Sequence, residues 1–265
     1  MAYALITGAS SGIGYELAEL FARHGHDVLL TARNETKLRR LAARLGDKYG
    51  VHAISYAIDL GGTDAAAKLH AFTTQRGLDV RYLANNAGFA EWSTFLDMPI
   101  ERVDEMLRVN VTALTELAHR YGRDMRRAGG GRILNVSSVA SMMAGPYMAT
   151  YFASKAYVRS FSEALAYELK GSGVSVTCVC PGPTTTGFAA AAHMAGINFF
   201  TLTRPATARQ LAEYAYRSMM RGRTLAYHGP TTMAGALAER LLPRAVTRRI
   251  AAVMNGGDPS RAHRR

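Results

Sequence analysis

The sequence alternates short runs rich in apolar and β-branched residues with longer segments whose apolar residues recur every three or four positions. In the segment Ile13–His24, for example, Leu17, Leu20 and Phe21 fall on one helical face. Strands that alternate with helices form βαβ units, which build a parallel sheet covered on both faces. The expected strands are Tyr3–Thr7, Asp27–Ala32, Val51–Tyr56, Val80–Ala84, Ile133–Ser137, Val174–Val179 and Thr224–Tyr227, and the expected helices are Ile13–His24, Glu35–Tyr49, Thr63–Arg76, Ile100–Ala128, Thr150–Lys170 and Ala206–Met220.

The chain of 265 residues has no linker, internal repeat or low-complexity segment. A single α/β domain often reaches about 200–250 residues. We therefore expect one domain over residues 1–230 and treat residues 231–265 as a basic, amphipathic extension of it.

A glycine-rich turn links the first expected strand to the first helix. Its sequence, Thr7-Gly8-Ala9-Ser10-Ser11-Gly12-Ile13-Gly14, has the spacing G-x-x-x-G-x-G. Glycines permit a tight turn and a close approach of the backbone, and a helix N-terminus offers free N–H groups to a phosphate. At this place in an α/β pattern, the turn predicts a site for the pyrophosphate of a dinucleotide.

Four further motifs follow in order: Asn85-Asn86-Ala87-Gly88, Ser138, Tyr151-Phe152-Ala153-Ser154-Lys155 and Pro181-Gly182. Together with the glycine turn they cover about residues 3–190, and the chain resembles the short-chain dehydrogenase/reductase family. The resemblance implies a single Rossmann-type domain, a doubly wound parallel sheet flanked by helices. It also implies hydride transfer between a nicotinamide cofactor and a carbonyl or alcohol.

Tyr151 and Lys155 are four residues apart on an expected helix, so they share one face. An ammonium close to a phenol favours the phenolate and lowers the phenol pKa, which suits acid–base chemistry on a carbonyl. Ser138 lies 13 residues before Tyr151, at the end of a strand, where parallel sheets place their ligands. Ser137 is the competing serine, and we expect its side chain on the other face of the strand.

The resemblance assigns a role to each member of this group. Tyr151 would be the general acid–base, and Lys155 would lower its pKa and hold the nicotinamide ribose. Ser138 would hydrogen-bond the substrate oxygen, and Asn110 would hold a water that passes protons to the lysine. The expected cofactor-binding residues are Gly8, Ser10, Ser11, Gly12, Ile13, Gly14, Arg33, Asp59, Leu60, Asn86, Ala87, Gly88, Tyr151, Lys155, Pro181, Gly182, Thr184 and Thr186. Thr184, Thr185 and Thr186 are consecutive, and the choice among them stays open.

The exit of the second strand favours NADP(H) over NAD(H). Ala32 stands where an acid would bind the ribose 2′-hydroxyl, and Arg33 follows directly. A planar guanidinium suits a 2′-phosphate by charge and geometry. Ser11 stands where many NADP-using relatives carry a second basic residue, although Ser10 or Ser11 could donate to the phosphate.

The substrate side of the expected site is apolar. By resemblance, residues 184–205 form a substrate lid. Met142, Met143, Tyr147 and Met148 would add an apolar wall to the substrate pocket. We expect an apolar carbonyl or alcohol substrate, with loose specificity because methionine walls adapt. The alternative is that the lid segment only packs on the core.

The composition argues against several other classes of protein. Two cysteines, Cys178 and Cys180, exclude a disulfide scaffold and a cysteine-rich zinc site, so no metal is expected. No apolar run is long enough to span a bilayer, and no signal peptide is evident, which predicts a cytoplasmic protein. The net charge is +12, but no nucleic-acid-binding motif is present, so we do not expect nucleic acid as a partner. We expect the protein to form a homodimer or homotetramer.

Two other functions stay open. The first is a catalytically silent dinucleotide sensor or scaffold, against which the complete set of Ser138, Tyr151, Lys155 and Asn110 argues. The second is a lipid or acyl reductase that binds a membrane surface through residues 231–265. This segment contains seven arginines and only two acidic residues. Pro243 divides that segment into two short amphipathic pieces. We favour packing of these pieces over the lid or a partner subunit, because they lack a Trp or Phe anchor.

Overall fold

The computed structural model of the chain describes residues 2–185, 192 and 205–257. Seven parallel strands form one sheet in the order β3-β2-β1-β4-β5-β6-β9, and β7 and β8 form a separate short pair. The strands are β1 (Tyr3–Thr7), β2 (Asp27–Ala32), β3 (Ala53–Ala57), β4 (Val80–Asn85), β5 (Gly131–Val136), β6 (Val174–Cys180), β7 (Thr184–Thr185), β8 (Ala206–Thr207) and β9 (Leu225–Tyr227).

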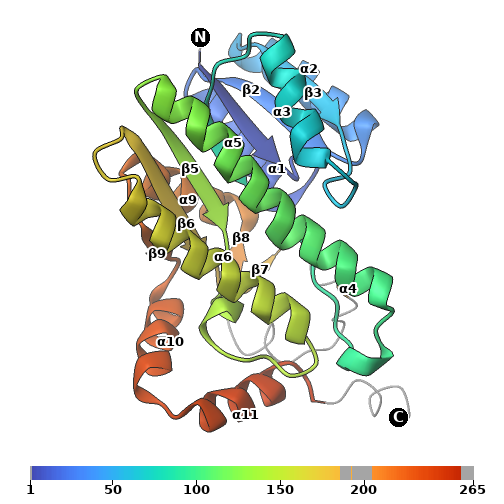
Figure 1. Cartoon of the computed structure of the whole chain (residues 1–265), viewed down its shortest axis with the longest axis vertical. Coiled ribbons are helices and arrows are strands. Elements are labelled where there is room, and N and C mark those ends of the chain that lie inside the picture. Colours follow the sequence, from blue (N-terminus) through green and yellow to red (C-terminus); the bar gives the residue numbers. More distant parts are fainter. Residues whose placement is uncertain (1, 186–191, 193–204, 258–265) are drawn as a thin grey trace.

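Helices cover both faces of the sheet (Figure 1). Along β1, Leu5 faces the apolar cluster that contains Leu69 and Tyr121, whereas Ile6 faces the opposite cluster with Leu17 and Phe21. This alternation follows from the two-residue period of a strand. One face carries α1 (Gly12–Arg23), α2 (Glu35–Tyr49) and α9 (Ala208–Met220), and the other carries α3 (Ala65–Gln75), α5 (Leu114–Arg127) and α6 (Ala149–Glu168). The expected α/β fold with a doubly wound parallel sheet is confirmed.

The strand order reverses between β1 and β4, because β1 pairs with β2 on one side and β4 on the other. Connections on the two sides then leave toward opposite faces of the sheet, which opens a crevice at the carboxyl ends of these strands. The glycine-rich turn after β1 and the Asn86 turn after β4 both lie at this crevice.

The long helix expected over Ile100–Ala128 is interrupted. It consists of α4 (Ile100–Leu107), a π-helical segment (Arg108–Ala113) and α5. The expectation of one regular helix was therefore wrong in this segment. Within this segment, Asn110 bonds to Phe89, which is 21 positions away in the sequence. Short π-helical segments occur frequently at functional sites.

Two helices end the described chain, α10 (Pro230–Leu241) and α11 (Arg244–Met254), with Pro243 between them as expected. They lie beyond the end of the sheet toward which the strand arrows point (Figure 1). No helix in the part of the chain that the structure describes is long and apolar enough to cross a bilayer. Cys178 and Cys180 are buried free thiols.

Candidate active site

The turn between β1 and α1 is shaped by its glycines. Gly8 and Gly12 have φ angles of +69° and +57°, in the left-handed region that favours glycine. A Cβ on Gly14 would overlap the carbonyl oxygen of Gly8. The backbone therefore folds back on itself closely, and its atoms line the cavity without side chains in front of them.

The turn after β4 is bonded to the glycine turn. The side-chain amide of Asn86 donates to the Thr7 carbonyl over 2.9 Å. The Thr7 hydroxyl oxygen accepts from the backbone N–H groups of Asn86 and Ala87, both at 2.9 Å. A cavity of about 720 Å³ opens beside these turns. A cradle of backbone at a helix N-terminus, in which a Cβ has no room, fits the diphosphate of a dinucleotide.

Tyr151 and Lys155 lie on α6 and face this cavity together with Ser138, which follows β5. Both side chains are buried, with 8 % of Tyr151 and 4 % of Lys155 exposed. Burial raises the pKa of Tyr151 to about 12, although a hydrogen bond with the Ser138 side chain acts in the opposite direction. Burial also lowers the pKa of Lys155 to about 8.

The pKa of Tyr151 therefore differs in direction from the sequence expectation. The Lys155 ammonium donates to the carbonyl oxygen of Val136 over 2.8 Å, and its nitrogen lies 5.9 Å from the centre of the Tyr151 ring. Desolvation of the phenol outweighs any effect of this ammonium. Tyr151 consequently keeps its proton at neutral pH.

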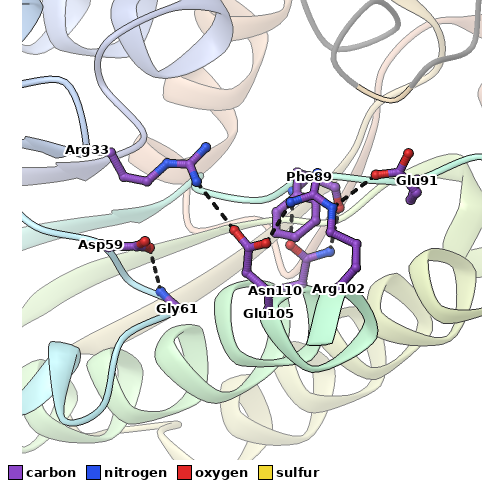
Figure 2. Close-up of polar contacts among 8 residues, drawn as sticks. All are labelled: Arg33, Asp59, Gly61, Phe89, Glu91, Arg102, Glu105 and Asn110. Carbon is purple, nitrogen blue, oxygen red and sulfur yellow. Dashed lines mark hydrogen bonds and ion pairs between the residues drawn. The ribbon is translucent and has the colours of Figure 1, made fainter. Parts of the chain in front are cut away.

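Asn110 lies behind Lys155 in the π-helical segment and is fully buried. Its amide donates to the Phe89 carbonyl over 2.9 Å, and its oxygen accepts from the Phe89 N–H at 3.1 Å (Figure 2). The same amide also donates to the Ser154 hydroxyl over 3.1 Å. A Cβ on Gly88 would lie 3.0 Å from the Asn110 oxygen and 3.3 Å from the Lys155 nitrogen. A side chain at position 88 would therefore crowd both residues, and glycine lets this turn pack closely against them.

The two neighbouring serines have different partners. The Ser137 hydroxyl donates to the Lys155 backbone carbonyl over 2.8 Å and is buried. The Ser138 oxygen accepts from the Ala140 N–H over 3.1 Å and also bonds to Tyr151. Ser137 therefore supports α6, and Ser138 is the serine bonded to the tyrosine.

At the other end of the cavity, the Arg33 side chain is 70 % exposed and pairs with Glu105 over 3.3 Å. Asp59 accepts from the Gly61 N–H at 2.9 Å (Figure 2). Glu105 lines the cavity but was missed by sequence reasoning. The only available signal was its position, about one helical turn before Asn110.

Most residues expected from the sequence line one cavity. They are Gly8, Ser10, Ser11, Gly12, Ile13, Arg33, Asp59, Leu60, Asn86, Ala87, Gly88, Ser138, Tyr151, Lys155, Pro181, Gly182 and Thr184. Gly14 packs beneath the turn, and Asn110 lies behind the wall. Thr186 and most of the expected lid over 184–205 lie outside the described residues.

The apolar end of the cavity includes the expected methionines Met142, Met143 and Met148. Tyr147, which the sequence also predicted for this wall, does not line the cavity. Seven further residues do, and of these only Ala192 belongs to the expected lid. They are Phe152, Ala192, Thr232, Gly235, Ala251, Met254 and Asn255. Five of these seven belong to or follow the last two helices, so α10 and α11 form part of the cavity wall.

Comparison with known proteins identifies the family of the chain. The family model described as short chain dehydrogenase matches residues 2–195. The chain is 36 % identical to a very-long-chain 3-oxoacyl-CoA reductase of Laccaria bicolor over 66 % of this chain and 52 % of the relative. It is 32 % identical to a 7beta-hydroxysteroid dehydrogenase of Collinsella aerofaciens over 69 % of each protein. The chain belongs to the short-chain dehydrogenase family.

A solved structure supports the same assignment. A short-chain dehydrogenase from Sphingobium yanoikuyae in complex with NADPH has a TM-score of 0.81 and 32 % identity, and the match covers 91 % of this chain and 94 % of that one. The chain spans about half the length of the fungal reductase, 52 %. This partial coverage does not show that the chain has the activity of the fungal reductase.

Proposed function

We propose that this chain is an NADP(H)-dependent oxidoreductase that interconverts a carbonyl and a secondary alcohol on an apolar substrate. The observation that carries the proposal is that Ser138, Tyr151 and Lys155 line the same cavity as the glycine turn. The cofactor, when bound, supplies or accepts the hydride. Gly8, Gly12 and the α1 N-terminus would hold its diphosphate, and Arg33 its 2′-phosphate.

Tyr151 acts as the general acid in reduction. Because its pKa is about 12 in the protein without ligand, its hydroxyl carries the proton that the carbonyl oxygen needs as it gains negative charge. Ser138, which is hydrogen-bonded to Tyr151, donates to the same oxygen. Lys155 and Asn110 lie behind the tyrosine, where they restore its proton and hold the ribose.

The substrate is large and apolar. Met142, Met143 and Phe152 line the cavity beside Tyr151, and Met254 faces it from the C-terminal end of α11. Methionine side chains reshape easily around different apolar ligands. The names of two relatives, a 3-oxoacyl-CoA reductase and a hydroxysteroid dehydrogenase, describe substrates with large apolar bodies.

A carbonyl panel tests the proposal. NADPH is mixed with the protein and, in separate reactions, an oxosteroid, a long-chain 3-oxoacyl thioester and a small polar keto sugar, and nicotinamide absorbance is followed. We expect NADPH oxidation with at least one apolar carbonyl and little with the sugar. Binding of NADPH without oxidation across a wider panel would favour the silent sensor instead. The homodimer or homotetramer and the cytoplasmic location remain predictions, and sedimentation velocity measures the first.

A further inference from the structure

Four residues of alternating charge form a row of ion pairs (Figure 2), and two of them, Arg33 and Glu105, line the cavity. Arg33 pairs with Glu105 over 3.3 Å, Glu105 pairs with Arg102 over 2.6 Å, and Arg102 pairs with Glu91 over 3.0 Å. Glu105 is therefore shared between two arginines. The two arginines differ in how firmly they are held, and this difference carries the inference.

Arg102 is the firmly held partner. Its guanidinium contacts both Glu91 and Glu105 and lies 4.1 Å from the centre of the Phe89 ring. Phe89 in turn is bonded through both of its backbone groups to Asn110. The Glu105 carboxylate is thereby anchored to the frame of the site.

Arg33 is the loosely held partner. Its side chain is 70 % exposed, and a single contact of 3.3 Å joins it to Glu105. An exposed ion pair of this kind contributes little, about 0–1 kcal/mol. Arg33 can therefore turn to another anion at small cost, whereas Glu105 stays as a negative charge on the cavity wall.

We propose that Glu105 is a specificity-determining residue, whose anchored carboxylate competes with the 2′-phosphate of NADPH for Arg33. This inference rests on the proposed function. The second strand ends at Ala32 without the acid that would oppose a 2′-phosphate. Glu105 supplies a carboxylate to the same region from α4, 72 positions away from Arg33. Glu105 thus narrows the preference for NADPH over NADH.

The test compares the dissociation constants of NADPH and NADH for Glu105→Gln and the unchanged protein, measured by calorimetry without substrate. Glutamine keeps the size of the side chain and its capacity to accept from Arg102, and removes the charge. We expect NADPH to bind about two- to five-fold more tightly, because the exposed pair contributes about 0–1 kcal/mol, and NADH to change less than about two-fold. The gain should shrink in high salt because the pair is exposed.

Asp104→Asn is the matched control. Asp104 precedes Glu105 on α4, pairs with Arg108 over 3.0 Å, and is not among the cavity-lining residues. The two variants change the net charge equally, so an equal gain in both would mean a general charge effect and overturn the proposal. Weaker NADPH binding in Glu105→Gln would mean that Glu105 supports Arg33, which also overturns it.

The double variant Arg33→Ala with Glu105→Gln isolates the competition. If Glu105 acts by occupying Arg33, its replacement should tighten NADPH much less once Arg33 is absent. An undiminished gain would contradict competition for Arg33. Failure of the unchanged protein to bind NADPH would defeat the proposed function itself, whereas normal binding with no response to Glu105→Gln would defeat only this inference. Thermal melts check that each variant is folded.

Discussion

The two sides of the cavity are built in different ways. On the cofactor side, hydrogen bonds between the side chains and backbones of Thr7 and Asn86 hold two turns together, and Gly14 packs so closely on Gly8 that no Cβ fits. On the substrate side, methionines and the inner faces of α10 and α11 form the wall. Hydrogen bonds fix a geometry, whereas flexible apolar side chains adapt. The difference implies one well-defined cofactor and a tolerant substrate pocket.

The outer faces of the last two helices sharpen this contrast. Leu237 on α10 and Val253 on α11 are 61 % and 71 % exposed. Arg244, Arg248 and Arg249 are exposed beside them, and none has an acidic partner among the residues that the structure describes. The substrate side thus ends in a surface that is apolar and basic, unlike the closely bonded cofactor side.

The largest effect is expected where the two sides meet, at Tyr151. Tyr151→Phe removes the proton donor, and we expect turnover to fall by about 10²–10⁴-fold for every carbonyl while NADPH affinity stays unchanged. Steady-state kinetics and calorimetry measure the two effects. Tyr157→Phe is the control, since Tyr157 lies on the same helix and bonds to Thr115. Near-normal turnover of Tyr151→Phe would remove this residue from the mechanism.

A change at Arg33 should affect one cofactor only. Arg33→Ala removes a charge-assisted contact worth about 1.5–3 kcal/mol, so NADPH should bind about ten- to a hundred-fold more weakly and NADH almost equally well. Arg39→Ala is the control, because Arg39 is an exposed α2 residue paired with Glu35. An equal loss for both cofactors would show that Arg33 does not contact the 2′-phosphate.

The pH dependence of reduction should follow Lys155. Burial lowers the pKa of Lys155 to about 8, so its ammonium is present below that pH and lost above it. Tyr151, with a pKa of about 12, stays protonated over the same range. We expect kcat for reduction to fall about fifteen-fold between pH 8 and 9.5, because the ammonium that restores the tyrosine proton is lost. A rate that stays constant to pH 10 would contradict this role.

The smallest effect is expected from the outer faces of the last helices. Removal of residues after Gly229 should weaken substrate binding several-fold or disrupt assembly, because it deletes part of the cavity wall, while NADPH binding is kept. Leu237→Ser with Val253→Ser changes only the exposed faces and should alter the oligomeric state without changing kcat.

Sedimentation with anionic vesicles decides whether the last two helices pack within the protein or bind a membrane surface. Salt-sensitive binding by the full chain, lost on truncation with activity intact, would show a membrane surface instead.

The cofactor side was also the more predictable side. The glycine turn, the Asn86 turn and the Tyr151–Lys155 pair are local sequence patterns. The two turns follow the ends of β1 and β4, and the pair lies near the start of α6. The π-helical segment was missed, and within it Asn110 makes a non-local bond to Phe89, 21 positions away. The direction of the Tyr151 pKa was missed because burial depends on packing that no local pattern reports. Glu105 was missed because its partner Arg33 is distant in the sequence.

The most direct test of the account follows the hydride itself. The protein is incubated with NADPH that carries deuterium at the transferable nicotinamide position and with the best apolar ketone of the panel, and the product is analysed by mass spectrometry and NMR. The account predicts a secondary alcohol with one deuterium on the carbon that bore the oxygen, formed by the unchanged protein and almost absent with Tyr151→Phe. An alcohol without deuterium, or equal deuterium transfer by both proteins, would contradict it.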